Sequence, residues 1–275
     1  MSTSNEILIL LRKLIKLIDK GTDCAKTIPE GIIEWDNIEN RFYKIDNETY
    51  NNSFKLSHVD KQKNILLKNT MLFASGKPSN NVLLWGARGT GKSSLVLSVY
   101  KTVLKTKKIS LLEIKTNQIK YLGFIIRTLS KTDRKFILFC DDFSFTSNNE
   151  DFILFKNILD GSVSKNKNIL YYVTSNYRNI IKENYSYQSD SMLKKQEKIE
   201  DETALSDRFG LWLGFETFNE EKYLDVVVKY CDLYDLKIEK NVLKKRALQW
   251  SLSRGSRSGR EALNFVKSLF LDKRH

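Results

Sequence analysis

One eight-residue segment constrains this chain more than any other feature. The segment Gly86-Ala87-Arg88-Gly89-Thr90-Gly91-Lys92-Ser93 matches the phosphate-loop pattern G-x-x-x-x-G-K-[ST] and follows a short apolar run at 82–85. Its glycines allow the backbone to curl so that several N–H groups converge on one phosphate. Lys92 is placed to reach the β- and γ-phosphates of a nucleotide, and the Ser93 hydroxyl is placed to ligate Mg²⁺. A helix that begins here and continues through Ser94 would direct its positive N-terminus at the phosphates.

Length and composition allow one large domain or two smaller ones. The chain has 275 residues, of which 41% are apolar, so a sizeable core is expected. No apolar run reaches the ~18 residues that a bilayer requires, and the first residues lack a basic region and a small-residue cleavage site. We therefore expect a cytoplasmic protein without a membrane partner. Its three widely spaced cysteines predict reduced thiols, and its two histidines argue against a metal cluster or a Ser/His/Asp triad.

The net charge of +13 raises the question of a polyanionic partner. Residues 1–55 carry 8 basic and 9 acidic side chains, residues 56–218 carry 25 and 16, and residues 219–275 carry 13 and 8. The basic excess therefore belongs to the part of the chain that includes the phosphate loop and to the C-terminal part, which suits nucleic acid as a possible partner. The abundance of Lys, Asn and Ile offers a second explanation, the composition bias of an AT-rich genome.

Short apolar runs alternate with helical patterns in the middle of the chain. The expected strands are 82–85, 109–114, 136–140, 169–174 and 211–215, and the expected helices are 59–75, 92–105, 116–130 and 150–160. This alternation predicts an α/β fold with a doubly wound, parallel, five-stranded sheet. Three further helices, at 219–234, 239–253 and 258–271, predict a small all-α lid domain.

The expected division is an N-terminal helical extension at 1–55, a nucleotide-binding domain at 56–218 and a helical lid at 219–275. Within the extension, residues 4–20 predict an amphipathic helix, and residues 31–50 predict a helix and a loop. The polar segment 182–203 predicts a long surface loop.

Two carboxylates follow the third expected strand. Asp141 and Asp142 end the run 136–140, at the strand end where ligands bind in open parallel sheets. We expect Asp141 to hold Mg²⁺ through water, together with Ser93, and Asp142 to orient or deprotonate the attacking water. Asn176, after the fourth strand, is placed to hydrogen-bond that water or the γ-phosphate.

Arginines near the fifth strand and in the lid complete the candidate site. Arg208 precedes the strand at 211–215, where it is either a helix-end cation or an arginine finger for a neighbour's nucleotide. Arg260 lies at the start of the last helix, an unfavourable place for a cation, and is expected to contact the γ-phosphate from the lid. Arg257 is the competing candidate.

These elements, in this order, resemble the AAA+ superfamily of P-loop ATPases. The segments 80–94, 139–145, 205–212 and 254–260 also resemble an uncharacterised bacterial AAA+ family, domain-of-unknown-function family 815. The resemblance covers about residue 55 to the C-terminus and implies the fold and nucleotide binding, but no biological role. Asp142 stands where most AAA+ ATPases have Glu, and this shorter carboxylate is expected to serve, more slowly.

The resulting hypothesis is an ATPase that uses ATP and Mg²⁺ to drive a conformational switch on a protein or nucleic-acid partner. Residues 86–94 and Arg260 would bind the nucleotide, Asp142, Asn176 and Arg208 would act in hydrolysis, and the protein would assemble as a homo-oligomeric ring or filament. Three alternatives remain open at this stage. One is a nucleic-acid-associated ATPase similar to a helicase loader, and another is a module that binds nucleotide without significant turnover. The third is a threading unfoldase, since Tyr121-Leu122-Gly123 resembles a pore loop, although its place within a helical face favours core packing.

Overall fold

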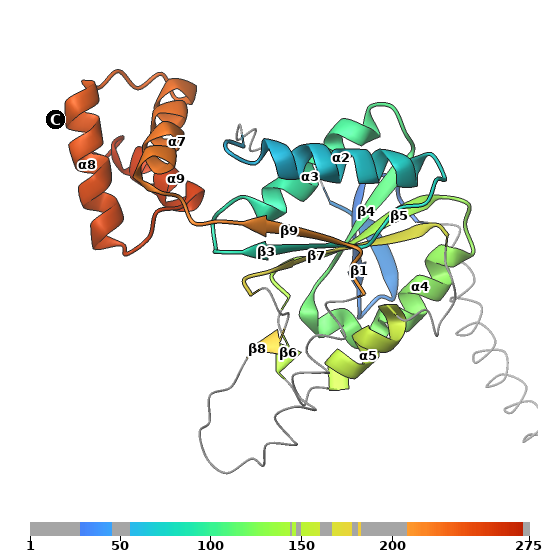
Figure 1. The fold of residues 1–275 in the computed structure, drawn as a ribbon. Helices are drawn as coiled ribbons and strands as arrows, with labels where there is room; N and C mark the ends of the chain where they lie inside the picture. Colours follow the sequence, from blue (N-terminus) through green and yellow to red (C-terminus); the bar gives the residue numbers. More distant parts are fainter. Residues whose placement is uncertain are drawn as a thin grey trace, which may run out of the picture.

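The structure is a three-layer α/β unit followed by a small helical unit (Figure 1). The computed structural model describes residues 28–45, 56–143, 145–146, 150–159, 167–177, 181–182 and 208–271. In the main sheet the strands are β1 (Ile32–Asp36), β2 (Arg41–Lys44), β3 (Val82–Gly86), β4 (Ile109–Ile114), β5 (Lys135–Cys140), β7 (Ile169–Ser175) and β9 (Leu211–Phe215). Around it lie α2 (Asp60–Ala74), α3 (Lys92–Leu104), the 3-10 helix η2 (Thr116–Tyr121), α4 (Leu122–Ser130) and α5 (Glu150–Leu159).

The sheet has the order β2-β1-β4-β5-β7-β3-β9. All neighbouring pairs are parallel except β1 and β2, which pair antiparallel through Ile33↔Lys44 and Asp36↔Arg41. β3 lies between β7 and β9, with Leu84 opposite Thr174 on one side and Leu213 on the other. The carboxyl ends of β3, β5 and β7 therefore meet at one edge of the sheet, which is where the phosphate loop begins.

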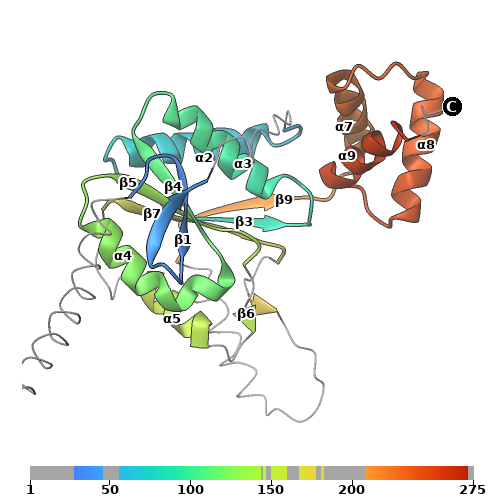
Figure 2. The same ribbon diagram turned by 180° about the vertical axis from the view of Figure 1, so that it is seen from behind.

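Both faces of the sheet are covered by helices. Helices α2 and α3 lie on one face, and α4 and α5 lie on the other, as the front and back views show (Figures 1 and 2). Because each central strand is buried on both sides, its sequence is a continuous apolar run rather than an alternating one. In β5, for example, Phe136, Ile137 and Leu138 are all fully buried although they point alternately to the two faces.

The five strands and the helices expected from the apolar patterns are confirmed, with boundaries that differ by three residues at most. The segment expected as a helix at 116–130 begins with the 3-10 helix η2 before α4 starts at Leu122. The predicted helix at 4–20 lies outside the described residues, and so does the polar segment 182–203 apart from Lys182. Lys182 belongs to a small parallel pair that the sequence analysis missed, β6 (Phe145–Thr146) with β8 (Ile181–Lys182).

The prediction of a helix and a loop at 31–50 was wrong. Residues 32–44 form the hairpin β1–β2, which extends the expected five-stranded sheet to seven strands. β1 is held by parallel pairing with β4, where Ile33 lies opposite Leu112, and Trp35 and Phe42 pack edge to face with ring centroids 4.8 Å apart. This pairing joins segments about eighty residues apart, so no local sequence pattern predicts that residues 32–44 form a hairpin. The division of the chain at residues 55 and 218 stays a prediction.

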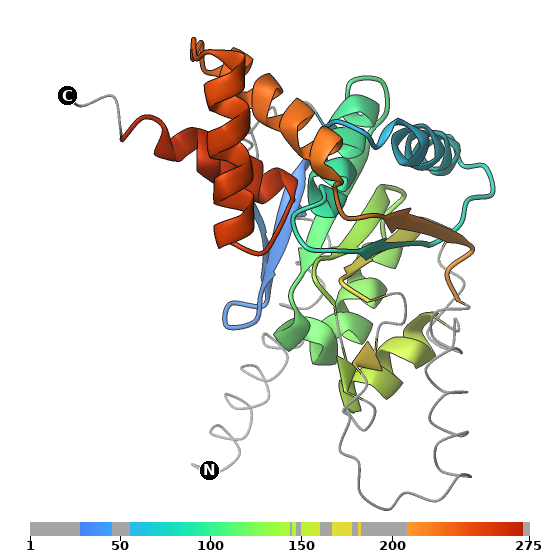
Figure 3. The same cartoon turned by 60° about the vertical axis from the view of Figure 1, so that its left-hand side comes forward.

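The C-terminal unit consists of α7 (Glu220–Leu233), α8 (Lys240–Ser253) and α9 (Gly259–Ser268), and it is called the lid below. Figure 3 shows these helices packed against one another at the end of the molecule. Their shared core includes Tyr223, Val227 and Phe265. Two helices begin at side-chain caps, because Asn219 accepts from the Lys222 N–H at 2.8 Å and Ser258 accepts from the Glu261 N–H at 3.2 Å. Within the described residues, no helix has both the length and the apolar character needed to cross a bilayer.

The end of β3 offers a test of the packing around the phosphate loop. Gly86 has φ +135°, and a Cβ at this position would lie 2.0 Å from the Phe215 carbonyl oxygen. We expect Gly86→Ala to lower the free energy of unfolding by about 2 kcal/mol or more in urea denaturation, from backbone strain and displacement of β9. Gly123→Ala is the control, because a Cβ there meets nothing within 4 Å. It should leave stability unchanged or raise it by up to about 1 kcal/mol, since Ala favours a helix over Gly. Equal stability of Gly86→Ala and the wild type would contradict the close approach.

Candidate nucleotide site

The phosphate loop connects β3 to α3, and its backbone depends on two left-handed glycines. Gly89 has φ +72° and Gly91 has φ +99°, a region that L-residues with side chains rarely adopt. Gly91 is also the residue before the first turn of α3, which starts at Lys92. The free N–H groups of that turn point into the loop, so the loop and the helix together form a site suited to an anion.

Lys92 lies inside the loop and contacts its backbone. Its side chain is buried, and its Nζ donates to the carbonyl oxygens of Gly86 at 2.7 Å and Ala87 at 2.9 Å. A third, longer hydrogen bond runs to Asn176 Oδ1 at 3.3 Å. Burial lowers the pKa of the Lys92 ammonium, while the carboxylates of Asp142 and Asp141 oppose that shift. The ammonium is thus a poorly hydrated cation held only by neutral oxygens, which favours an incoming anion.

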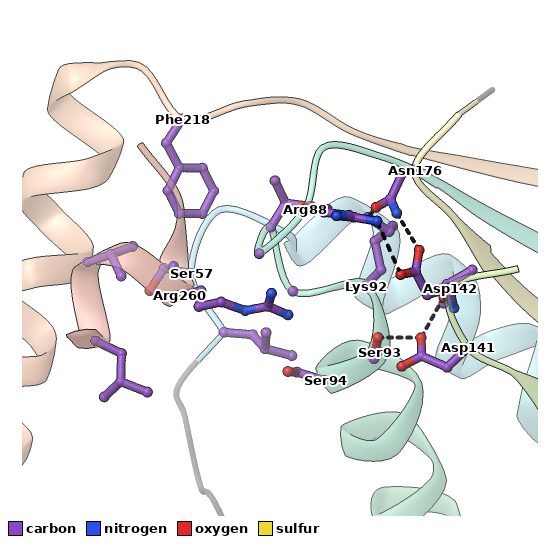
Figure 4. Close-up of a pocket in the computed structure, with 18 of the residues that line it drawn as sticks. Ser57, Arg88, Lys92, Ser93, Ser94, Asp141, Asp142, Asn176, Phe218 and Arg260 are labelled. Atoms are coloured by element: carbon purple, nitrogen blue, oxygen red, sulfur yellow. Dashed lines mark hydrogen bonds and ion pairs between the residues drawn. The ribbon is translucent and has the colours of Figure 1, made fainter. Parts of the chain in front are cut away.

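Asp141 joins three elements of the fold. One of its carboxylate oxygens, Oδ1, accepts from the Ser93 hydroxyl at 2.5 Å and from the Thr174 hydroxyl at 2.5 Å. Ser93 belongs to α3 and Asp141 follows β5, and Figure 4 shows the two side chains joined. Thr174 belongs to β7. The Thr174 hydroxyl also accepts from the Asp142 N–H at 2.8 Å, so a single side chain positions both acidic residues.

Asp142 projects into the site from a left-handed backbone conformation, with φ +51°. Its carboxylate accepts a hydrogen bond from Asn176 Nδ2 and lies 3.6 Å from the Arg88 guanidinium. The Arg88 and Asp142 side chains are 71% and 58% exposed, and an ion pair so exposed contributes at most about 1 kcal/mol. A more highly charged anion could therefore easily replace Asp142 at the Arg88 guanidinium.

The lid closes the other side of the site. The Gly259 N–H, at the start of α9, donates to the Gly89 carbonyl at 2.9 Å. A Cβ on Gly89 would lie 2.7 Å from Ser258 Oγ and 3.0 Å from Arg260 Cβ, so the lid approaches the loop too closely for any other residue. Arg260 lines the cavity, whereas Arg257 pairs with Glu220 at 3.7 Å and is not part of the lining. Between the two lid arginines, the structure therefore places Arg260 at the site.

These groups surround a cavity of about 540 Å³. Its polar lining residues include the phosphate loop from Arg88 onward, both acidic residues, Thr174, Asn176 and Arg260, and its apolar ones are Leu56, Phe218, Val226, Tyr230 and Leu263. In Figure 4, Phe218 lies on the lid side of the cavity, and Asp141 and Asp142 lie on the opposite side. A cavity with both phosphate-binding and apolar lining residues suits a nucleotide, because the base is flat and poorly hydrated while the phosphates are charged.

Gly86 and Ala87 do not line the cavity but accept hydrogen bonds from Lys92, so Arg208 is the predicted site residue that lies away from these groups. It precedes β9, whose first residue, Leu211, pairs with Val82, while the loop starts beside Phe215 at the far end of β9. Within β9, the four steps from Leu211 to Phe215 span roughly 13 Å in extended chain, and Arg208 lies three residues before Leu211. The Arg208 side chain is exposed and is not among the residues that line the cavity of its own chain.

Sequence reasoning missed Thr174 and the apolar lining of the cavity. Thr174 directly precedes Ser175-Asn176, so a hydroxyl at the end of a buried strand was a visible signal for it. Phe218, Tyr230 and Leu263 belong to the lid, and nothing in their spacing indicates that they face the phosphate loop.

Thr174 provides a test of the network around the acidic residues. Thr174→Val keeps the shape of the side chain but leaves the Asp142 N–H and the Asp141 carboxylate each without one partner. We expect the free energy of unfolding to fall by about 1–3 kcal/mol in urea denaturation. Thr174→Ser is the matched control, since it keeps the hydroxyl and loses one methyl group, at a cost of about 1 kcal/mol. If Val proves no worse than Ser, the hydroxyl does not hold the two residues.

A family model described as "Protein of unknown function (DUF815)" matches residues 31–272. No curated protein sequence matches the chain. Among solved structures, the Orc1 protein of Aeropyrum pernix in complex with DNA has TM-score 0.55 and 14% identity, over 81% of this chain and 62% of that one. PCH-2 of C. elegans has TM-score 0.52 and 17% identity, over 82% and 65%.

The RuvB Holliday junction branch migration motor of Thermotoga maritima has TM-score 0.46 and 14% identity, over 78% of this chain and 70% of that one. At such identities the likeness concerns the fold, and this chain spans less than two thirds of the Orc1 and PCH-2 chains. The family match covers most of the sequence, so the chain belongs to the DUF815 family and has the fold of the AAA+ P-loop ATPases.

Proposed function

We propose that the protein binds Mg²⁺-ATP between the phosphate loop and the lid and hydrolyses it. The observation that carries the proposal is the convergence of Lys92, Ser93 and the two acidic residues on one cavity that the lid residue Arg260 also lines. The phosphates bind at the loop, where the N-terminal N–H groups of α3 and the Lys92 ammonium are directed at them. The base lies against the apolar lining, beside Phe218 and Tyr230.

The residues at the loop also suit a magnesium ion. Ser93 and Asp141 supply hydroxyl and carboxylate oxygens, the hard ligands that Mg²⁺ prefers, and their oxygens already lie 2.5 Å apart. Phosphate oxygens and water would complete the shell, as is usual for Mg²⁺ at nucleotides. When bound, the ion neutralises charge on the phosphates.

Asp142, Asn176 and Arg88 act at the γ-phosphate end. Asp142 accepts the proton of the attacking water, and Asn176, which already bonds Asp142 and Lys92, orients that water. The γ-phosphate competes with Asp142 for the Arg88 guanidinium, because a phosphate carries more charge than a carboxylate and the present Arg88–Asp142 contact is long, at 3.6 Å. Binding of ATP then frees the Asp142 carboxylate for its role as a base.

The lid couples the nucleotide to a change of shape. Arg260 binds the γ-phosphate, and the Gly89–Gly259 hydrogen bond links the loop directly to α9. Loss of the γ-phosphate removes one anchor of the lid, so ATP-bound and ADP-bound protein would differ in lid position. This two-state movement is the switch by which hydrolysis would act on a partner.

Arg208 is proposed to act on a neighbouring subunit. It does not line the cavity of its own chain, whereas a head-to-tail ring or filament would bring it to the next subunit's γ-phosphate. Its charge would stabilise the transition state there, as arginine fingers do.

Two substitutions separate binding from hydrolysis. Lys92→Ala should weaken ATP binding by about 10- to 150-fold in calorimetry, because a charge-assisted contact of about 1.5–3 kcal/mol is lost. Asp142→Asn should bind Mg²⁺-ATP like the wild type and release phosphate about 10²-fold more slowly or worse. Unchanged ATP affinity of Lys92→Ala would contradict the site. Wild-type protein that binds ATP but releases no phosphate would instead be a nucleotide-binding module without turnover.

Mixing experiments test the proposed role of Arg208. Arg208→Ala should bind ATP normally and lose about 10³-fold or more in turnover. Adding Lys92→Ala subunits, which are inactive alone, should restore part of the activity, because some interfaces then pair an intact site with an intact finger. The rate of the wild type should also rise more than linearly with protein concentration. Inactive mixtures together with a monomeric, concentration-independent wild type would rule out both the finger and the oligomer.

A further inference from the structure

The parallel strands all begin along one side of the sheet, the side farthest from the lid, and this side carries a cluster of cations. Strands β1, β4, β5, β7 and β3 are consecutive neighbours, and the segments that lead into them share this edge (Figures 1 and 2). These segments, at 28–31, 105–108, 131–135, 167–168 and 75–81, contain two acidic residues, Glu30 and Asp133. Their eight basic residues, called the basic edge below, are Lys77, Lys105, Lys107, Lys108, Lys131, Arg134, Lys135 and Lys167.

Two cations of the basic edge are held in place without being neutralised. Arg134 donates to the carbonyl oxygens of Ile28 at 2.6 Å and Pro29 at 2.7 Å and to the Ser110 hydroxyl at 2.6 Å. Lys135 donates to the Lys167 carbonyl at 2.9 Å, and its ammonium lies 5.2 Å from the centre of the Phe73 ring. Every one of these partners is neutral, so none of these contacts cancels either charge.

Five other members, Lys77, Lys105, Lys108, Lys131 and Lys167, are exposed. Within the part of the chain that the structure describes, none of the five forms an ion pair, although seven such pairs occur elsewhere. The attraction of cations to helix C-termini accounts for only part of this cluster. Helices α2, α3 and α4 end near this edge, but a helix dipole favours cations chiefly in its last turn, and these lysines follow that turn.

The composition of the edge favours nucleic acid over a protein partner. The core of a protein interface is rich in aromatic and apolar side chains. These segments expose little apolar surface. Leu104, with 37% of its surface accessible, is the only exposed large apolar residue among the described residues in or directly beside them. A surface of many flexible lysines with so little apolar area suits contacts with phosphates, which do not depend on base sequence.

We propose that the basic edge binds the phosphate backbone of nucleic acid. The four gaps between the five strands span roughly 19 Å, a length over which a DNA duplex carries about 11 negative charges. This surface lies at the opposite ends of the strands from the phosphate loop, so the protein would hold nucleic acid and nucleotide at the same time. The proposal does not rest on ATP hydrolysis.

The test is a titration of a fluorescent 20-base-pair DNA duplex at 50–200 mM salt, in EDTA and without nucleotide. The edge variant is Lys105→Glu/Lys108→Glu/Lys131→Glu, and the control is Lys240→Glu/Lys244→Glu/Lys245→Glu on the exposed surface of α8. Both variants lower the formal net charge from +13 by six, to +7. The corresponding Lys→Gln variant of the edge removes the same three charges without adding repulsion, and urea denaturation reports on the folding of every variant.

We expect the wild type to bind the duplex with a steep salt dependence. The edge variant should bind at least tenfold more weakly, with a log Kd against log salt slope smaller by about 2.7, since three phosphate contacts are lost. The Gln variant should lose affinity in the same direction, and the lid control should stay within about threefold of the wild type. Any of three results would overturn the proposal: no duplex binding by the wild type at 50 mM salt, equal weakening by the edge and lid variants, or displacement of DNA by poly-L-glutamate as effectively as by unlabelled DNA. The last result would assign the edge to an acidic protein.

Discussion

The site depends on one carboxylate oxygen. Asp141 Oδ1 accepts hydrogen bonds from Ser93 and Thr174, and it thereby ties α3 and β7 to the end of β5. Hydrogen bonds to a charged group contribute about 1.5–3 kcal/mol each, a large share of a domain's marginal stability. Because Thr174 also holds the Asp142 N–H, the same small network sets where the proposed base stands relative to the phosphate loop. Fold stability and site geometry are therefore not separable here.

A second constraint is the contact between the loop and the lid. Gly89 has no side chain, which allows α9 to begin directly on its carbonyl oxygen. The same approach brings Arg260 to the cavity and leaves Arg257 to pair with Glu220. If phosphate binding changes the conformation of the loop, the contact between Gly89 and the start of α9 must change as well. This coupling needs no long pathway, since one hydrogen bond separates the two elements.

The parallel sheet separates two kinds of charge. At the carboxyl ends of the strands, one cavity is lined by both cations and carboxylates, as a site for phosphates and a metal requires. At the beginnings of the strands, roughly 20 Å away along a six-residue strand such as β5, cations predominate and their known partners are neutral. A ligand at one edge and a polyanion at the other would not compete for space. The rigid strands between them would carry any influence of one on the other.

The sequence by itself determined the phosphate loop, the five central strands, the lid helices and the acidic pair, because each depends on local spacing. Buried strands are continuous apolar runs and helices show their own period, so both are visible without knowledge of neighbours. Tertiary structure alone decided the rest. The hairpin at 32–44 exists because β4 offers it a free edge, Arg260 rather than Arg257 meets the cavity because of how α9 docks on Gly89, and Thr174 acquires its role only when β5 and β7 lie side by side. These outcomes depend on contacts between segments distant in the chain, whose relative positions no local pattern contains.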